Sequence, residues 1–203
     1  MPKLVIATNN AHKVIEICAI LEREIPGFPI SEVTSARDYD LPEPVEDAPD
    51  FAGNALIKAR VIAETLGVPA LADDSGICVD ILGGAPGIFS ARWAGKHGDD
   101  QANLDLLLAQ LSDVPQQYRG ARFTAVTALV IPGVGEWTET AFVPGTLRFA
   151  RAGEGGFGYD PIFQPDGYEQ TMAELDLAEK NRISHRARAL TAIAPIIAAN
   201  IAY

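Results

Sequence analysis

The stretch LVIATNNAHK (residues 4–13) joins two patterns and decides the class of fold. Its first residues are apolar and suit a short buried strand, and the polar Thr8, Asn9 and Asn10 end that strand. Asn and Thr are favoured helix N-caps, because their side-chain oxygens accept the first free backbone N–H groups. Residues 11–24 then carry apolar side chains at helical spacing. The chain therefore begins as strand, turn and helix, a unit typical of α/β folds.

Local sequence leaves two interpretations of this turn open. A helix N-terminus offers free N–H groups and a partial positive charge, and Lys13 adds a full charge nearby, so the turn suits a phosphate group. An ordinary capped helix with a surface lysine fits the same residues.

The bulk composition limits the classes of partner. The chain has 203 residues, 48% of them hydrophobic, and a net charge of −11. This length suits one domain over residues 1–203, and the acidic charge makes a nucleic-acid polymer or an anionic membrane a poor partner. Cys18 and Cys78 lack metal-ligand spacing, and we expect both to be free and buried. Free cysteines, together with the lack of a recognisable signal peptide or membrane span, predict a cytoplasmic protein.

The remaining patterns predict a mixture of helices and strands. Helices are indicated over residues 51–67 and 99–111 and from about Ser184 onward. Two β-rich runs, residues 119–131 and 136–150, are expected to pair as an antiparallel hairpin. This mixture predicts an α/β fold in which helices flank a mixed β-sheet.

The stretch LADDSG (residues 71–76) places two adjacent carboxylates in an apolar strand pattern. We expect the strand to be broken at this Asp-Asp-Ser-Gly segment. Because successive strand side chains point to opposite faces, Asp73 and Asp74 cannot both face one site of a regular strand. Carboxylates at a strand end suit Mg²⁺, but an Asx-turn that ends the strand is an equal alternative. Glu46, in an acidic loop, is either a second oxygen ligand or a solvated charge.

Two further stretches suggest ligand binding. GEGGFGYDPIF (residues 153–163) sets two aromatic rings among glycines. Glycines permit close backbone approach, so a ring on this loop could stack on a planar base. Alternatively, the aromatic rings fill the core where the chain leaves the hairpin. AEKNRISHRARAL (residues 178–190) puts His185 and Arg186 in the first turn of the final helix, where positive charge is mildly unfavourable. An anionic or carbonyl-bearing ligand would compensate for that charge, and a solvated basic patch is the alternative.

Taken together, these features describe a site for a nucleoside polyphosphate and Mg²⁺. The sequence has no GxxxxGK[ST] P-loop and no GxGxxG turn after a strand, so the common nucleotide-binding motifs do not explain it.

Six stretches occur in an order typical of one enzyme family: TNNAHK, FAGNALIKA, LADDSG, LGGAPGIFSARWAG, GGFGYDPIF and ISHRARAL. Over nearly its whole length the chain resembles the inosine/xanthosine triphosphate pyrophosphatases. The resemblance implies Mg²⁺-dependent hydrolysis of deaminated purine triphosphates (ITP, dITP and XTP) to the monophosphate and pyrophosphate, which cleanses the nucleotide pool. It also implies a two-lobed α/β fold with a long mixed sheet, an active-site cleft between the lobes, and a homodimer.

The resemblance also implies roles for individual residues. Asp74 matches the catalytic aspartate, and Glu46 and Asp74 match the metal ligands. Lys58 matches a helix lysine and Ser75 a serine that contact the substrate. The other positions that match substrate-binding residues are Thr8, Asn9, Asn10, Ala11, His12 and Lys13 at the triphosphate, Phe157, Gly158, Tyr159 and Asp160 in the base loop, and Lys180, His185 and Arg186 near the C-terminus.

The chain departs from the family pattern at two places. The family usually reads Glu-Asn-Ala where this chain has Gly53-Asn54-Ala55, and Glu-Thr-Gly where it has Glu46-Asp47-Ala48. The carboxylate missing at Gly53 would remove a metal ligand or a supporting contact, and Asp47 or Asp50 would be the substitute. Because of this departure, an alternative function stays open: a nucleotide-binding protein with lost or altered pyrophosphatase specificity. A further alternative is a related pyrophosphatase that prefers pyrimidine or modified nucleotides, but the SHR and FGYD stretches argue against it.

Overall fold

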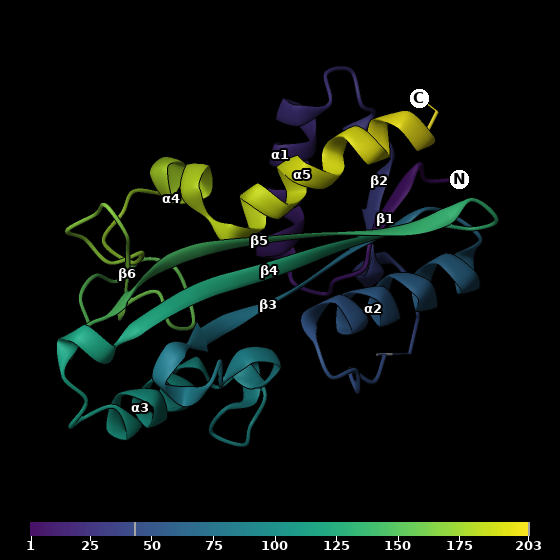
Figure 1. Cartoon of the computed structure of the whole chain (residues 1–203). Coiled ribbons are helices and arrows are strands. Elements are labelled where there is room, and N and C mark those ends of the chain that lie inside the picture. The colour runs from purple at the N-terminus through teal and green to yellow at the C-terminus, as the bar shows by residue number, and fades with distance from the viewer. Residues whose placement is uncertain (43, 203) are drawn as a thin grey trace. The chain divides into compact units, whose positions relative to one another are not determined.

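A computed structural model describes residues 1–42 and 44–202, apart from the side chain of His12 (Figure 1). The chain divides into two compact units, each with its own core. The first consists of Met1–Asp74, Ala125–Ala141 and Arg186–Tyr203, and the second of Ser75–Thr124 and Phe142–His185.

The described strands form one six-stranded sheet in the order β2-β1-β3-β4-β5-β6. Strand β1 pairs in parallel with both β2 and β3, whereas β5 pairs antiparallel with β6. Strands β4 and β5 are neighbours joined by only three residues, a connection that antiparallel strands alone can make. The predicted mixed sheet and hairpin are thus confirmed. The strands are β1 (Leu4–Ile6), β2 (Val33–Ser35), β3 (Ala70–Val79), β4 (Gly120–Ile131), β5 (Gly135–Leu147) and β6 (Phe163–Pro165).

The described α-helices agree with the predictions except for one. The first predicted helix is α1 (Ala11–Glu24), and the second is α2 (Phe51–Leu66), which ends at Gly67 with a left-handed φ of 66°. The third is α3 (Asp100–Gln110), and the last, α5 (His185–Asn200), begins directly after Ser184 as expected. The short α4 (Leu177–Ile183) was not predicted from the sequence.

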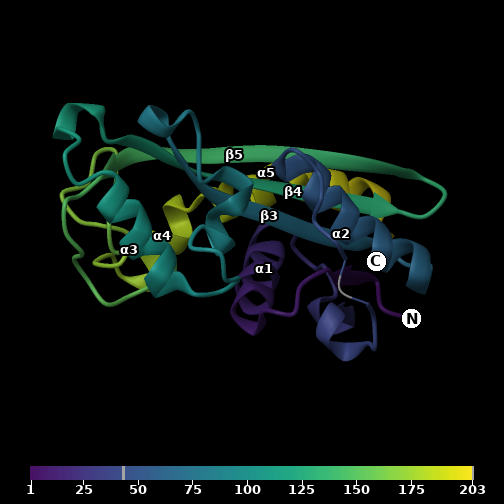
Figure 2. The same ribbon diagram turned by 90° about the horizontal axis from the view of Figure 1, so that it is seen from below.

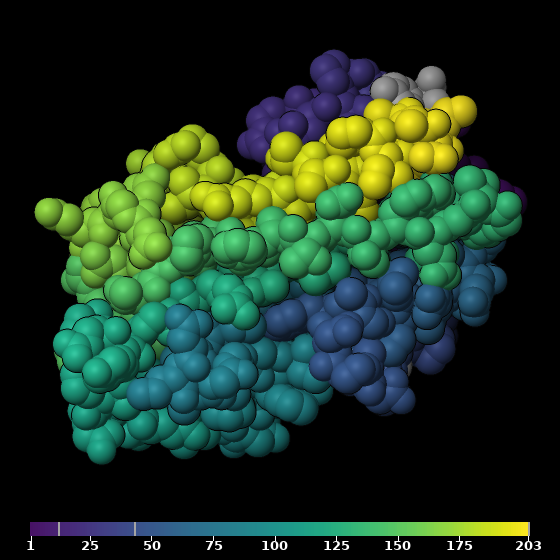
Figure 3. All heavy atoms as spheres, in the orientation of Figure 1, coloured from purple at the N-terminus to yellow at the C-terminus, as the bar shows by residue number. Residues whose placement is uncertain are grey.

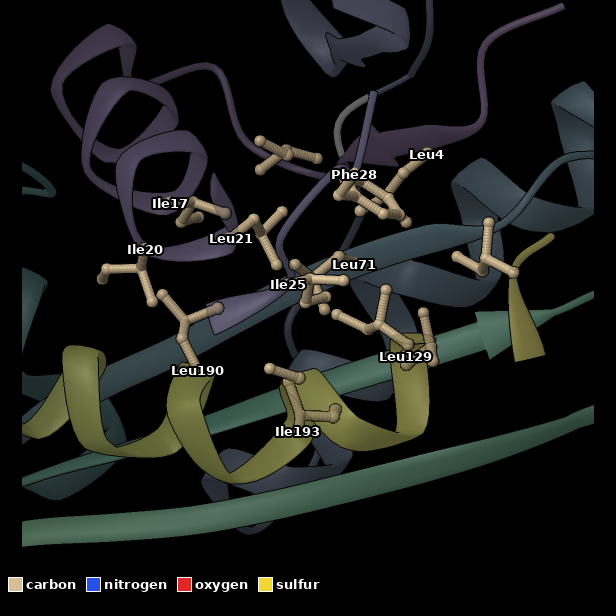
Figure 4. Close-up of a cluster of buried hydrophobic side chains, with 14 of the residues drawn as sticks. Leu4, Ile17, Ile20, Leu21, Ile25, Phe28, Leu71, Leu129, Leu190 and Ile193 are labelled. Carbon is tan, nitrogen blue, oxygen red and sulfur yellow. The ribbon is translucent and has the colours of Figure 1, made fainter. Parts of the chain in front are cut away.

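In the first unit, alternate residues of β3 face two different cores. Leu71 belongs to a cluster with Ile17 and Leu21 of α1 and Leu190 and Ile193 of α5 (Figure 4). Its neighbours on either side in β3 belong instead to a cluster with the apolar face of α2. Helices α1 and α5 therefore cover one face of the first-unit strands and α2 covers the other (Figure 1), and Figure 2 shows α2 in front of β4 and α5 behind it.

The C-terminal helix α5 is the outer layer of the cluster that contains Leu71. Its surface, yellow in Figure 3, lies next to the green surface of the β4–β5 connection. Trp137 of β5 packs against the same cluster, so the hairpin end and α5 share one core.

The second unit encloses a buried cation, Arg119, which is fully inaccessible to solvent. Its guanidinium donates hydrogen bonds to the carbonyl oxygens of Leu147 (2.8 Å), Leu111 (2.5 Å) and Arg148 (2.8 Å). It also lies 4.3 Å from the centroid of the Phe149 ring. Arg119 therefore ties the end of α3 to the exit of β5.

Three sequence predictions need correction. Strand β3 runs unbroken through the Asp-Asp-Ser-Gly segment, because each carboxylate finds a basic partner on its own face of the strand. The second hairpin strand ends at Leu147, short of residue 150. Both cysteines are free, and Cys78 is buried as expected, but Cys18 is only half-buried.

In the part of the chain that the structure describes, no helix is long and apolar enough to cross a bilayer.

Candidate active site

The carboxylate of Asp73 is the centre of a buried ion-pair cluster in the first unit. Its Oδ2 lies 3.1 Å from Lys13 Nζ on α1 and 3.0 Å from Arg186 Nε on α5. The Arg186 guanidinium also binds Glu16 Oε2 at 2.7 Å. Burial disfavours the ionised form of Asp73, but the charges of Lys13 and Arg186 outweigh burial and hold its pKa well below the ordinary value. This cluster joins α1, β3 and α5.

The carboxylate of Asp74 has a different partner, Lys58 of α2. Lys58 Nζ lies 2.9 Å from Asp74 Oδ1 and 3.5 Å from Glu46 Oε1, so two carboxylates converge on one cation. Burial raises the pKa of Asp74 above its ordinary value of 3.8, and the charge of Lys58 opposes that rise only in part. A carboxylate with a raised pKa is a stronger base than an ordinary one, which suits proton abstraction.

The donors around Lys58 fit a magnesium ion. Glu46 and Asp74 offer carboxylate oxygens, and Mg²⁺ is commonly held by one or two carboxylates, with waters and substrate phosphates completing its shell. Among the described residues, no three His, Cys, Asp or Glu side chains gather closely enough to hold a metal on their own. The two carboxylates would leave the other positions of a Mg²⁺ shell to waters and phosphate oxygens.

The turn before α1 has the caps that its sequence predicts. Asn10 Oδ1 accepts a hydrogen bond from the backbone N–H of Lys13 at 3.4 Å, and Thr8 Oγ1 accepts one from the backbone N–H of Asn10 at 3.2 Å. Asn9 is exposed and Ala11 is half-buried in the same turn, whereas the side chain of His12 lies outside the described residues. The turn is therefore a capped helix start, and Lys13 reaches from this helix to Asp73.

The glycine-rich loop of the second unit is held by Asp160. Its Oδ2 accepts hydrogen bonds from the backbone N–H of Phe157 (2.9 Å) and from Lys180 Nζ (2.5 Å). The Phe157 ring is 54% exposed, and Lys180 Nζ lies 5.1 Å from its centroid. Gly156 is required here, because a Cβ at this position would lie 2.1 Å from Asp160 Oδ2. The loop thus presents an aromatic ring beside a lysine.

Tyr159 of the same loop faces inward. It is 5% exposed, and its hydroxyl donates a hydrogen bond to the Ser90 carbonyl at 2.8 Å. The backbone N–H of Gly158 is bound by Asp100 Oδ2 of α3 at 2.9 Å. His185 stacks on Phe123 with ring centroids 4.9 Å apart. These contacts make the loop a fixed part of the second unit.

Comparison with known proteins identifies the family. The sequence profile of the Ham1 family matches residues 4–196. The chain belongs to the Ham1 family.

Curated relatives of this Ham1-family chain match it end to end. It is 56% identical to the dITP/XTP pyrophosphatase of Leifsonia xyli, with 98% of this chain and 97% of the relative covered. It is 53% identical to the dITP/XTP pyrophosphatase of Streptomyces coelicolor, with 97% and 98% covered.

Solved Ham1-family structures share the α/β fold. A HAM1 protein from Coxiella burnetii has a TM-score of 0.86 at 34% identity, over 97% of this chain and 98% of that one. A nucleoside-triphosphatase, also named dITP/XTP pyrophosphatase, from Mycobacterium abscessus has a TM-score of 0.78 at 44% identity, over 96% and 98%. The predicted family and fold class are confirmed.

The structure brings predicted site residues together as three sets. The first unit unites Lys58, Asp74 and Glu46, and it joins Lys13 to Arg186 through Asp73. The second unit unites Phe157, Asp160 and Lys180. Lys180 lies inside α4, which the sequence analysis did not predict. Ser75 follows Asp74 in β3 and is half-buried. The roles of these residues, and the cleft that the resemblance implies, stay predictions.

Sequence reasoning missed several supporting residues. The sequence does not indicate the partners of Asp73. It does not single out Glu16 either, which holds Arg186 and lies one helical turn after Lys13. Asn54, one turn before Lys58, is fully buried and accepts a hydrogen bond from the backbone N–H of Ala48 at 3.0 Å. Spacings of three or four residues from the predicted lysines would have pointed to both.

Proposed function

We propose that the protein hydrolyses deaminated purine nucleoside triphosphates, namely dITP, ITP and XTP, to the monophosphate and pyrophosphate. One observation carries the chemistry: two carboxylates, Asp74 and Glu46, converge beside Lys58, and the pKa of Asp74 is raised. The curated relatives named dITP/XTP pyrophosphatase support the choice of substrate.

The triphosphate would be bound by the first unit. Lys13 and Lys58 provide full positive charges, and the N-terminus of α1 adds a partial one. Binding by Lys13 would have to compete with Asp73, which holds its ammonium group at 3.1 Å. A triphosphate carries several negative charges, so it competes effectively for that lysine.

Glu46 and Asp74 would hold Mg²⁺, which would neutralise charge on the phosphate oxygens. Asp74 would orient a water molecule and accept its proton on a carboxylate oxygen. The water oxygen then forms a bond to the α-phosphorus, the α–β anhydride bond breaks, and pyrophosphate leaves with the bonding electron pair. The reaction thus needs one base and several fixed positive charges.

The family resemblance supports roles in recognition of the purine base for Phe157, Lys180, His185 and Arg186. Hypoxanthine and xanthine carry a carbonyl acceptor at position 6, where adenine carries an amino donor. Donors placed at this position would pair with the first group and stay unpaired against the second, and buried unpaired donors give strong discrimination. Stacking on the exposed Phe157 ring would add affinity for any purine.

We also propose that the protein is cytoplasmic and works as a homodimer. The two free cysteines support a reducing compartment, and the family resemblance supports the dimer. Light scattering coupled to size-exclusion chromatography would give the mass in solution, and a monomer at micromolar concentration would contradict the dimer.

Pyrophosphate release from dITP, XTP, dGTP and ATP, each with and without Mg²⁺, tests the proposed function. We expect fast release from dITP and XTP only with Mg²⁺, and slow release from ATP. No release from any of the four would reject the proposal and favour a nucleotide-binding protein without this activity.

A further inference from the structure

The segment that carries Glu46 is attached to the first turn of α2 by two hydrogen bonds. The backbone N–H of Ala48 donates to Asn54 Oδ1 at 3.0 Å, and Asp50 Oδ1 accepts from the backbone N–H of Gly53 at 2.7 Å. Asn54 is fully buried, so the first bond is shielded from water. These bonds hold Ala48 and Asp50 against the helix that carries Lys58.

Gly53 lets this segment approach the helix closely. A Cβ at position 53 would lie 2.4 Å from the Ala48 Cβ and 3.3 Å from Asp50 Oδ1. Two carbon atoms in normal contact are about 3.5–4.0 Å apart, so the side chain of Ala48 occupies the space that any residue at position 53 would need.

Backbone conformation does not explain this glycine. Gly53 lies in α2 and is not among the residues with positive φ. A helix disfavours glycine relative to alanine, so the position gives up intrinsic helix stability. Exclusion of a side chain is therefore the physical reason for Gly53.

We propose that Ala48 and Gly53 are a matched pair that positions Glu46 beside Lys58 and Asp74. Two of the residues that depart from the family pattern, Ala48 and Gly53, are then one coupled change, because the methyl group at position 48 takes the space of the side chain at position 53. Glu46 and Asp74 remain the oxygen ligands, and Gly53 marks no loss of the metal site. This inference rests on the proposed function, since it assigns the pair a role in holding a metal ligand.

The pairing predicts that the effect of one substitution depends on the other. Gly53→Ala adds no charge and removes the glycine penalty of the helix, so it would stabilise an ordinary helix. Beside Ala48, however, it must push the Glu46 segment away. With Ala48→Gly the nearest remaining atoms are Asp50 Oδ1 at 3.3 Å and the Cα of residue 48 at 3.8 Å, so the new methyl group fits after a small shift.

A double-mutant cycle tests the inference with the wild type, Gly53→Ala, Ala48→Gly and the double variant. Mn²⁺ binding is measured directly by electron paramagnetic resonance, and the urea midpoint of unfolding is measured in parallel. With Ala48 present, we expect Gly53→Ala to weaken Mn²⁺ binding by about tenfold, the scale of a lost supporting contact, and to lower the urea midpoint. In the Ala48→Gly background, we expect the same substitution to change binding by less than about twofold and to raise the midpoint.

Equal effects of Gly53→Ala on Mn²⁺ binding in both backgrounds would overturn the inference. If Gly53→Ala alone does not fold, we expect Ala48→Gly to restore a folded protein, and a double variant that also fails to fold would overturn it. Failure of the proposed function is a separate result: the wild type would then release no pyrophosphate, whereas the reversal in the urea midpoint would still report on the steric pairing.

Discussion

The carboxylates of Asp73 and Asp74 lie on opposite faces of one continuous strand. Asp73 contacts Lys13 of α1 and Arg186 of α5, whereas Asp74 contacts Lys58 of α2. The alternation of side chains along a strand explains this division, since Leu71 faces the same core as α1 and α5. Two adjacent aspartates therefore have different surroundings: Asp73 connects three elements of the first unit, and Asp74 pairs with Lys58 near Glu46.

Asp73→Asn should destabilise the protein. The substitution leaves Lys13 and Arg186 with less negative charge around them in a buried place, and breaking a buried ion pair costs about 3 kcal/mol or more. Urea unfolding at neutral pH measures this loss. The matched control is Glu136→Gln, which removes the exposed Arg60–Glu136 pair and should cost about 1 kcal/mol or less. Equal losses for the two variants would contradict the structural role of Asp73.

The stability of the wild type should depend on pH through Asp73. Because the pKa of this carboxyl is lower in the folded protein, its contribution is complete above the ordinary value of 3.8 and is lost as pH falls below that value. Between about pH 6 and pH 3, the free energy of unfolding should fall more steeply for the wild type than for Asp73→Asn. Parallel curves would show that another group is responsible.

Lys58→Ala should move the acid limb of the pH–rate profile upward. Burial already raises the pKa of Asp74 above 3.8, and Lys58 opposes that rise, so removing its charge should raise the pKa further. Activity requires the ionised carboxylate, and kcat/KM should therefore begin to fall at a higher pH in the variant. Arg60→Ala, an exposed substitution two residues further along α2, is the control. If the acid limb does not move, a group other than Asp74 titrates there.

Arg186→Lys should reduce the preference for ITP over ATP. A lysine keeps the positive charge near Asp73 and Glu16 but lacks the fork of donors that a guanidinium offers to a carbonyl group. The ratio of kcat/KM for the two substrates should fall by about tenfold or more, the effect of one lost hydrogen bond. Arg188→Ala, an exposed change in the same helix, should leave the ratio unaltered. An unchanged ratio in Arg186→Lys would remove Arg186 from base recognition.

Arg119→Met should weaken the second unit without affecting the chemistry. The substitution leaves three buried carbonyl groups without their donor, which costs about 3 kcal/mol, and its contacts include none of the predicted site residues. We expect a lower urea midpoint together with a kcat within about twofold of the wild type at a temperature where the variant is folded. A variant as stable as the wild type would mean that the carbonyl groups find other donors.

Much of the fold could be predicted from local patterns. The apolar spacing of α1 and the helical pattern of residues 51–67 placed α1 and α2 correctly, because both patterns depend on neighbours in sequence. The short α4 escaped detection because seven residues hold too few turns for a periodic signal. Strand β3 was expected to break because its acidic residues resemble a turn, and only their distant partners explain why it continues.

The candidate site was predictable only in part. Motif resemblance named Asp74 and Lys58, but it could not show that Asp73 and Arg186 pair across 113 positions of sequence. Nor could it connect Ala48 with Gly53, since their relationship is a contact between a loop and a helix that local sequence does not encode.

The most direct test of the proposed mechanism compares pyrophosphate release from dITP by the wild type and Asp74→Asn at saturating Mg²⁺. Asparagine keeps the shape of the side chain but cannot accept the proton of the attacking water. We expect kcat to fall by about a thousandfold in a variant that still unfolds cooperatively in urea. A kcat near the wild-type value in a folded Asp74→Asn variant would contradict the assignment of Asp74 as the catalytic base.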